Sequence, residues 1–161
     1  MNVKQNAYDL LAELGIGFIK HEHEPAFTCE DSNRCLGADF VGLDAKSLFV
    51  RNKNKNQYYL ALVPIHKQVD MKALGEQLGE TRMSFASEDD LMEKLHACRG
   101  SVSLLNLANV DKTDVVVLVD GELMSAKQTA FHPNDNTETL VFDAKEIARI
   151  LDHKGVVWKV I

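Results

Sequence analysis

The chain is poor in cysteine and contains no long apolar run, and each shortage excludes a class of protein. Cys29, Cys35 and Cys98 are an odd number without a CxxC pair, which argues against a disulfide framework or a zinc knuckle. We therefore expect reduced, partly buried thiols. No stretch of eighteen apolar residues occurs, so we expect no membrane-spanning segment and no membrane partner.

Several catalytic and binding motifs are also missing. The sequence has no HExxH pattern for a zinc enzyme, no glycine-rich phosphate-binding loop and no nucleophile-elbow serine. His21 and His23 would project from one face of a strand, as two metal ligands do, but no third ligand accompanies them at a recognisable spacing. We expect a solvated strand there, and neither a metal nor another cofactor.

The composition that remains is typical of a globular protein, with 45% apolar and 26% charged residues. The length predicts one domain that spans residues 1–161. The first residues lack the apolar core of a signal peptide, so we expect a cytoplasmic protein. The net charge of −6 excludes a generally basic nucleic-acid-binding surface. A local basic patch can still attract an anion, because the nearby field steers it rather than the total charge.

Apolar spacing and turn residues predict helices and strands without regular βαβ alternation, which indicates an α+β fold. Asp70, Ser87 with Asp90, and Asp143 with Glu146 are predicted helix caps. Asp120 and Gly121 predict a tight turn into residues 122–124. The predicted helices are 3–14, 29–37, 71–78, 88–97 and a last one that ends before Gly155. The predicted strands are 18–23, 47–51, 57–64, 115–119, 129–132, 139–142 and 156–161.

The most informative segment is the predicted β-hairpin of residues 47–51 and 57–64, with an asparagine-rich turn between them. Lys46 lies at the base of this apolar hairpin. Either its stem covers apolar surface while its ammonium stays in water, or it meets an anionic ligand. A modest positive patch on or beside the hairpin contains Arg51, Lys53, Lys55 and Lys67. The alternative for these cations is a charged turn that keeps a sheet edge soluble.

Two loops carry polar groups that could contact a ligand. The segment from His132 to Thr137 combines an imidazole, two amides, a carboxylate and a hydroxyl directly after a strand. It either orients a small polar ligand or forms an Asx-rich turn whose side chains bond their own backbone. The loop that begins with Gly100 and Ser101 either presents backbone groups to a ligand or ends a helix.

Five short segments resemble one protein family in their order and spacing. They are the strand with Lys46, residues 58–64, residues 82–87, the loop that begins at Gly100, and Phe131-His132-Pro133 followed by Asn136 and Thr137. By these segments the chain is identified as a member of the YbaK-type family, which includes the editing insertion of bacterial prolyl-tRNA synthetases. It is most similar to the freestanding PrdX or ProX-like branch. The resemblance implies an α+β domain with a curved, mixed, partly closed and barrel-like sheet flanked by helices.

The same resemblance implies a trans-editing aminoacyl-tRNA deacylase. Such an enzyme hydrolyses the ester between a wrong amino acid and the terminal ribose of a tRNA, typically alanine on the tRNA for proline. The reaction needs no metal, and the tRNA 2′-hydroxyl is implied to take part. The implied partners are the acceptor end of aminoacyl-tRNA and either prolyl-tRNA synthetase or an elongation factor.

The resemblance also implies roles for individual residues. Lys46 matches the lysine that holds the terminal nucleotide through its phosphate, and His132 matches the histidine near the substrate amino acid. Gly100 matches the glycine of the loop that shapes the amino-acid pocket. These three are the expected catalytic residues. The expected substrate contacts are Ser47, Ser101, Leu104, Asn136 and Thr137, and the expected tRNA-steering cations are Arg51, Lys53 and Lys55.

Leu104 departs from the family pattern, because the loop usually reads Gly-x-x-x-Pro and leucine stands in place of the proline. We expect a looser loop and a pocket of changed size. This departure keeps open a second hypothesis, a non-catalytic module that binds tRNA or a synthetase on the same fold. A third hypothesis is a stress protein that binds a metal or small molecule through His21, His23 and the cysteines.

Overall fold

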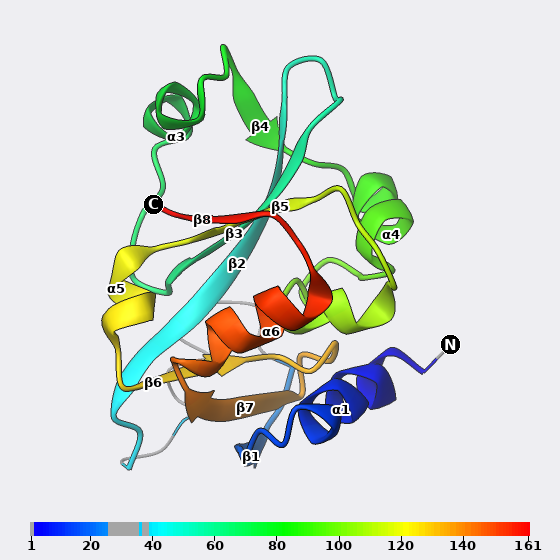
Figure 1. Ribbon diagram of the computed structural model, residues 1–161, viewed down its shortest axis with the longest axis vertical. Helices are drawn as coiled ribbons and strands as arrows, with labels where there is room; N and C mark the ends of the chain where they lie inside the picture. Colours follow the sequence, from blue (N-terminus) through cyan, green and yellow to red (C-terminus); the bar gives the residue numbers. More distant parts are fainter. Residues whose placement is uncertain (1, 26–35, 37–38) are drawn as a thin grey trace.

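The computed structural model of the chain describes residues 2–25, 36 and 39–161 (Figure 1). Its strands are β1 (Ile19–Glu22), β2 (Gly42–Asn52), β3 (Tyr58–Pro64), β4 (Met83–Phe85), β5 (Val116–Val119), β6 (Gln128–Phe131), β7 (Glu138–Asp143) and β8 (Trp158–Val160). They form one mixed sheet in the order β1-β7-β6-β2-β3-β5-β8, and β4 pairs with β2 beside this path. The path is open in the described residues, since β1 and β8 end it, so the expectation of a partly closed, barrel-like sheet is wrong. The α+β class with a mixed sheet flanked by helices is confirmed.

The sheet is organised around β2, which has three partners. It pairs antiparallel with β3 from Ala45 to Arg51, so the predicted hairpin is confirmed, although β2 begins at Gly42 rather than at Ser47. On the edge away from β3, residues 42–44 pair with β6 and residues 50–52 pair with β4. Residues 45–49 therefore have no strand partner on that edge among the described residues.

The two faces of the sheet carry separate cores, because successive side chains of a strand point to opposite faces. β3 is buried along its whole length. Leu60 and Leu62 belong to the larger core, which also contains Ile147 and Ile150 of α6 (Glu146–Lys154). Ala61 belongs to the smaller core, which includes the helix α3 (Met71–Leu78) on the other face.

Local capping groups start two helices as the sequence predicts. The side chain of Asp70 accepts hydrogen bonds from the first backbone N–H groups of α3. Ser87 and Asp90 form a capping box at the start of α4 (Glu88–Leu95). The first helix, α1 (Val3–Glu13), is followed by Gly15 with a φ of +65°, a conformation that glycine adopts without strain.

Two predicted turns and caps are wrong. Asp120 does not open a hairpin turn: its side chain accepts from the N–H of Glu122 and caps the short helix α5 (Gly121–Ser125). Asp143 does not cap α6, because it is the last residue of β7 and Lys145 precedes the helix without a side-chain cap.

Two elements have no counterpart in the sequence prediction, namely β4 and the 3₁₀ helix η1 (Leu104–Asn109). Both are too short to show a periodic pattern. The predicted helix 29–37 lies outside the described residues, except for Leu36. Cys98 is a free and exposed thiol, so the expectation of partial burial is wrong for this residue, and Cys29 and Cys35 lie outside the described residues.

Candidate active site

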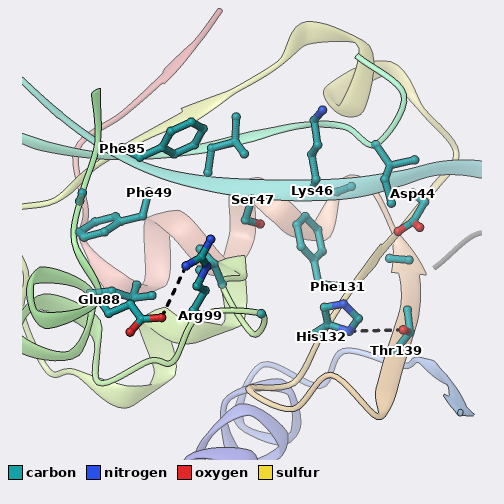
Figure 2. A pocket seen from close by; sticks show the side chains of 18 of the residues that line it. Asp44, Lys46, Ser47, Phe49, Phe85, Glu88, Arg99, Phe131, His132 and Thr139 are labelled. Atoms are coloured by element: carbon teal, nitrogen blue, oxygen red, sulfur yellow. Dashed lines mark hydrogen bonds and ion pairs between the residues drawn. The ribbon is translucent and has the colours of Figure 1, made fainter. Parts of the chain in front are cut away.

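A pocket of about 680 Å³ opens along the unpaired edge of β2, between β6 and β4. Residues 44–49 of β2 form one wall. The other walls come from residues 85–88, from Arg99, Gly100 and Val102, and from the end of β6 with His132 (Figure 2). The pocket thus exists because two strands pair with the ends of β2 and leave its middle uncovered.

Lys46 and Ser47 line this pocket from opposite faces of β2. Directly paired residues of antiparallel strands share a face. Lys46 pairs with Val63, on the face of the smaller core, while Ser47 pairs with Leu62 on the face of the larger core. Figure 2 shows the Lys46 side chain extending from β2 on the side away from His132. Lys46 and His132 therefore lie on two sides of one strand edge.

The Lys46 ammonium makes no hydrogen bond or ion pair with the described residues. Lys67, in contrast, pairs with Asp120 at 2.8 Å and with Glu122 at 3.1 Å. An unpaired ammonium at a pocket wall is available to an anionic ligand, and it is equally compatible with a solvated lysine.

The backbone of Ser47 also faces the pocket. The carbonyl of Phe49 accepts from the N–H of Ala86 at 3.0 Å, so the backbone groups of Phe49 point to the edge away from β3. Those of Ser47, two residues earlier, point the same way. The strand edge therefore directs a backbone N–H toward the pocket.

His132 follows β6 on the opposite wall and is largely withdrawn from water. Its Nδ1 lies 2.9 Å from the carbonyl oxygen of Glu138 and 3.5 Å from the hydroxyl of Thr139. Burial lowers the pKa of His132 below its ordinary value, and the nearby His23 acts in the same direction. The hydrogen bond to Glu138 opposes this shift without cancelling it. His132 is thus held as a neutral imidazole near pH 7.

Gly100 lines the pocket and has a φ of +90°, a conformation that favours glycine. Its N–H has no acceptor among the described residues. Ser101 does not line the pocket, and both of its backbone groups are used: its N–H donates to Cys98 and its carbonyl accepts from Asn106. Of the two, Gly100 alone offers a free backbone donor.

Leu104 is fully buried in the larger core and does not line the pocket. It is the first residue of η1, which Ser103 caps through bonds to Leu105 and Asn106. Proline is favoured at this first helical position, because its N–H would have no partner there and its φ suits the helix. With leucine at this position, both capping bonds of Ser103 are present.

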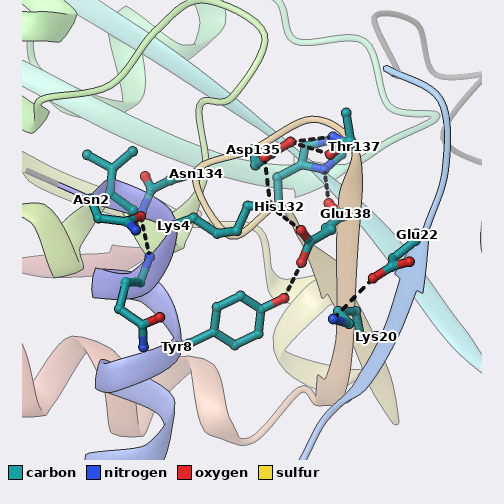
Figure 3. A network of polar contacts seen from close by, with 12 residues as sticks. Asn2, Lys4, Tyr8, Lys20, Glu22, His132, Asn134, Asp135, Thr137 and Glu138 are labelled. Carbon is teal, nitrogen blue, oxygen red and sulfur yellow. Dashed lines mark hydrogen bonds and ion pairs between the residues drawn. The ribbon is translucent and has the colours of Figure 1, made fainter.

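The loop after His132 is an internally bonded turn. Asn134 has a φ of +62° and bonds Asn106, Asn109 and the carbonyl of Val3. Asp135 accepts from the N–H and the hydroxyl of Thr137 at 2.8 and 2.6 Å (Figure 3). Neither Asn136 nor Thr137 lines the pocket. The Asx-turn reading therefore describes this loop better than the ligand-binding reading.

Lys4 and Tyr8 of α1 connect that loop to the first helix. Both bond the buried carboxylate of Glu138, and Lys4 also pairs with Asp135 at 3.1 Å (Figure 3). The hydrogen bonds from Thr137 make the largest contribution to lowering the pKa of Asp135 to about 2, and the bond and charge of Lys4 act in the same direction. The network holds the segment that carries His132 against α1.

Arg51, Lys53 and Lys55 lie at the far end of the hairpin, outside the pocket. At about 3.3 Å per strand residue, Arg51 is roughly 16 Å from Lys46 along β2. Its guanidinium donates to the carbonyl of Asn52, while Lys53 and Lys55 are exposed. Such cations can meet only a part of a ligand that extends well beyond the pocket.

Sequence reasoning did not assign several side chains to the pocket, among them Asp44, Phe85, Glu88, Arg99 and Thr139. Phe85 is 62% exposed at its mouth, and an exposed aromatic residue is a signal that only the structure reveals. Arg99 and Glu88 form a loose ion pair at 4.0 Å, both exposed. The described residues contain no group of three or more side chains arranged to hold a metal ion. None of the described helices is long and apolar enough to cross a membrane.

Comparisons with known proteins identify the family of this chain. A model of the aminoacyl-tRNA editing domain matches residues 23–150. The chain is 33% identical over 161 residues to the prolyl-tRNA editing protein ProX of Acetoanaerobium sticklandii, covering 100% of this chain and 98% of that protein. It is 29% identical over 158 residues to prolyl-tRNA synthetase associated domain-containing protein 1 of Xenopus laevis, covering 96% and 93%.

A solved structure described as a candidate trans-editing enzyme for prolyl-tRNA synthetase has the same fold. It superposes with a TM-score of 0.74 at 18% identity and covers 99% of this chain and 96% of that one. The family match and the full-length relative at 33% identity show the family as well as the fold. The chain belongs to the aminoacyl-tRNA editing domain family.

Proposed function

We propose that this protein is a trans-editing aminoacyl-tRNA deacylase, which hydrolyses the ester between an amino acid and the terminal ribose of a tRNA. The observation that carries the proposal is the pocket on the unpaired edge of β2, with Lys46 on one face of the strand and His132 on the other. Membership in the editing-domain family supports the same reaction.

The 3′ end of an aminoacyl-tRNA suits a pocket with two unlike sides. Its phosphate would meet the unpaired ammonium of Lys46, and its ester would lie across the edge of β2 toward Ser47 and His132. The exposed ring of Phe85 at the pocket mouth suits the terminal base, because aromatic side chains stack on bases of any sequence. Arg51, Lys53 and Lys55 would then contact the acceptor stem beyond the pocket.

The chemistry requires water to add to the ester carbonyl and the ribose oxygen to leave, which yields a free amino acid and an uncharged tRNA. The backbone N–H groups of Ser47 and Gly100 are the donors that we assign to the developing oxyanion. The neutral Nε2 of His132 accepts a hydrogen bond from the substrate or from the attacking water. Holding an activated ester in this geometry supplies a large part of the acceleration.

We propose alanine on the tRNA for proline as the substrate, with prolyl-tRNA synthetase as the enzyme whose errors are corrected. Two relatives carry prolyl-tRNA editing or prolyl-tRNA synthetase in their names, which supports this choice. The pocket can separate alanine from proline by size, although a difference of one or two methylenes is worth only about 1–3 kcal/mol.

The test is a deacylation assay with alanyl-tRNA for proline and with correctly charged prolyl-tRNA. Lys46→Ala should lower kcat/KM by about 10- to 100-fold, since a hydrogen bond to a charged group contributes about 1.5–3 kcal/mol. Lys46→Arg should retain part of the activity. The matched control is Lys112→Ala, which removes the same charge from an exposed residue outside this pocket and should leave kcat/KM nearly unchanged.

If the unmutated protein hydrolyses no mischarged tRNA, the enzyme proposal is wrong. Tight binding of aminoacyl-tRNA without loss of its ester would instead identify the non-catalytic binding module. Equal losses in Lys46→Ala and Lys112→Ala would remove Lys46 from the site and leave only a general charge effect.

A further inference from the structure

His23 packs behind His132, outside the pocket. The two ring centroids lie 6.2 Å apart with the planes at 60°. The hydroxyl of Thr139 lies 2.7 Å from Nε2 of His23 and 3.5 Å from Nδ1 of His132, so the two imidazoles share one hydroxyl. The backbone N–H of His23 also donates to the backbone carbonyl of Thr137 at 2.9 Å. The sequence assigned His23 to a solvated strand, and this contact arises only from the pairing of β1 with β7.

The partners of the two rings determine where their protons lie. Nδ1 of His23 is 2.8 Å from the carbonyl of Glu24, and a carbonyl can only accept, so this nitrogen carries hydrogen. In the neutral ring, Nε2 then accepts from the hydroxyl of Thr139. Nδ1 of His132 is protonated for the same reason, because it faces the carbonyl of Glu138. The acceptor that His132 retains is Nε2, which has no hydrogen-bond partner among the described residues.

We propose that His23 and Thr139 are positioning residues that hold His132 as a neutral imidazole with its Nε2 lone pair available to the pocket. The inference rests on the proposed deacylase function for the use of that lone pair, whereas the coupling of the two rings stands on their contacts alone. Figure 2 shows His132 at the pocket wall with Thr139 bonded to it.

The coupling is electrostatic as well as geometric. A proton on either ring opposes a proton on the other at this separation, and burial of His132 acts in the same direction. The carboxylates on this side are partly neutralised, because Lys4 bonds both Asp135 and Glu138. The charged groups around the pair are Glu22 and Glu24 beside His23, Lys4 on α1, and Asp135 and Glu138 beside His132. Asp44 and Arg99 line other walls of the pocket, and Lys46 extends from β2 away from His132.

A neutral His132 matters because only the unprotonated Nε2 can accept a hydrogen bond. The attacking water and the α-ammonium group of an aminoacyl ester are both donors. An imidazolium at this position would repel the ammonium and could not take a proton from water. The second imidazole therefore extends to lower pH the range in which Nε2 of His132 can accept a hydrogen bond.

The direct test is an NMR titration of the His132 ring in the unmutated protein, in His23→Gln and in His153→Gln. His153 is a control of the same residue type on α6, where it pairs with Glu13. In His23→Gln the titration midpoint of His132 should move to higher pH by roughly half to one pH unit, from Coulomb's law at this separation in a partly hydrated site. In His153→Gln it should not move.

A second measurement follows kcat/KM for deacylation against pH. The acid limb of the profile should move with the NMR midpoint in His23→Gln, while activity on the alkaline plateau stays close to that of the unmutated protein. Thr139→Ser, which keeps the hydroxyl, should retain the original profile, and Thr139→Val should not. A merely structural role of His23 would lower activity equally at every pH.

An unchanged His132 midpoint in folded His23→Gln would overturn the inference, as would a uniform loss of activity. The NMR measurement needs no substrate, so its outcome is independent of the proposed function. If the protein hydrolyses no aminoacyl-tRNA but the His132 midpoint shifts in His23→Gln, the coupling of the two rings is supported and its use in deacylation is not.

Discussion

Two buried threonines lie on neighbouring strands, and replacing each with valine should change the free energy of unfolding in opposite directions. Thr129 and Thr139 are 0% and 1% exposed. The hydroxyl of Thr129 finds no hydrogen-bond partner in the part of the chain that the structure describes. The hydroxyl of Thr139 lies 2.7 Å from Nε2 of His23. Valine has the same shape as threonine and lacks the hydroxyl, so the substitution isolates this one group.

The expected magnitudes follow from the cost of burying a hydroxyl. An unsatisfied buried polar group costs about 1–3 kcal/mol, so Thr129→Val should raise the free energy of unfolding by about 1 kcal/mol. Thr139→Val should lower it by about 1–2 kcal/mol, because it removes a bond and leaves His23 without its donor.

Urea unfolding measures both values, provided that the slope m is the same in the three proteins. For a chain of this size each kcal/mol corresponds to about 3 °C in Tm. Thr129→Ser, which keeps the hydroxyl and loses a methyl group, is the control and should be destabilising. If Thr129→Val and Thr139→Val shift the free energy of unfolding in the same direction, the assignment of a satisfied and an unsatisfied hydroxyl is wrong.

Three further predictions concern the segments that frame the pocket. Gly42→Ala should lower the free energy of unfolding by about 1–3 kcal/mol, because the added Cβ would lie 2.1 Å from the carbonyl oxygen of Gln128. Gly17→Ala, whose Cβ meets open space, is the control in the same unfolding assay. The pKa of Asp135 is lowered to about 2, so its contribution to stability is present above about pH 4 and is lost as the pH falls toward 2. In Thr137→Val the free energy of unfolding should depend less steeply on pH across that range, as measured by urea unfolding at several pH values. Leu104→Pro should leave the ratio of alanyl to prolyl deacylation nearly unchanged, because Leu104 lies outside the pocket and the extended backbone of Ser103 accepts a following proline. A large change of that ratio would return Leu104 to the amino-acid pocket.

Patterns that depend on neighbours in the sequence predicted most of the fold correctly. The apolar run of β3, the caps at Asp70 and Ser87, and the hairpin of β2 with β3 each have their determinants within a few residues. The wrong predictions also rest on local patterns, but on patterns that are compatible with more than one structure. An Asp-Gly pair is compatible with a hairpin turn and with a helix cap, and packing of Leu123 in the larger core decides for the helix.

The candidate site was predicted only in part. Lys46, Ser47, Gly100 and His132 line one pocket, whereas Ser101, Leu104, Asn136 and Thr137 do not. The spacing of the motifs along the chain cannot tell a residue that lines a pocket from its neighbour that packs behind it. For this reason Thr139 was not predicted, and His23 was considered only as a metal ligand and not as a neighbour of His132.

The sequence by itself determined the α+β class, the hairpin with its basal lysine, and the order of motifs that identifies the editing-domain family. These properties follow from side-chain periodicity, capping chemistry and local motifs, which need no knowledge of distant contacts. Only the tertiary structure decided that β6 and β4 leave the middle of β2 uncovered, that Lys46 and His132 lie on two sides of this edge, and that a second imidazole stands behind the first. Such arrangements arise from the pairing of strands that are far apart in the chain, so the contacts that create them have no local signature.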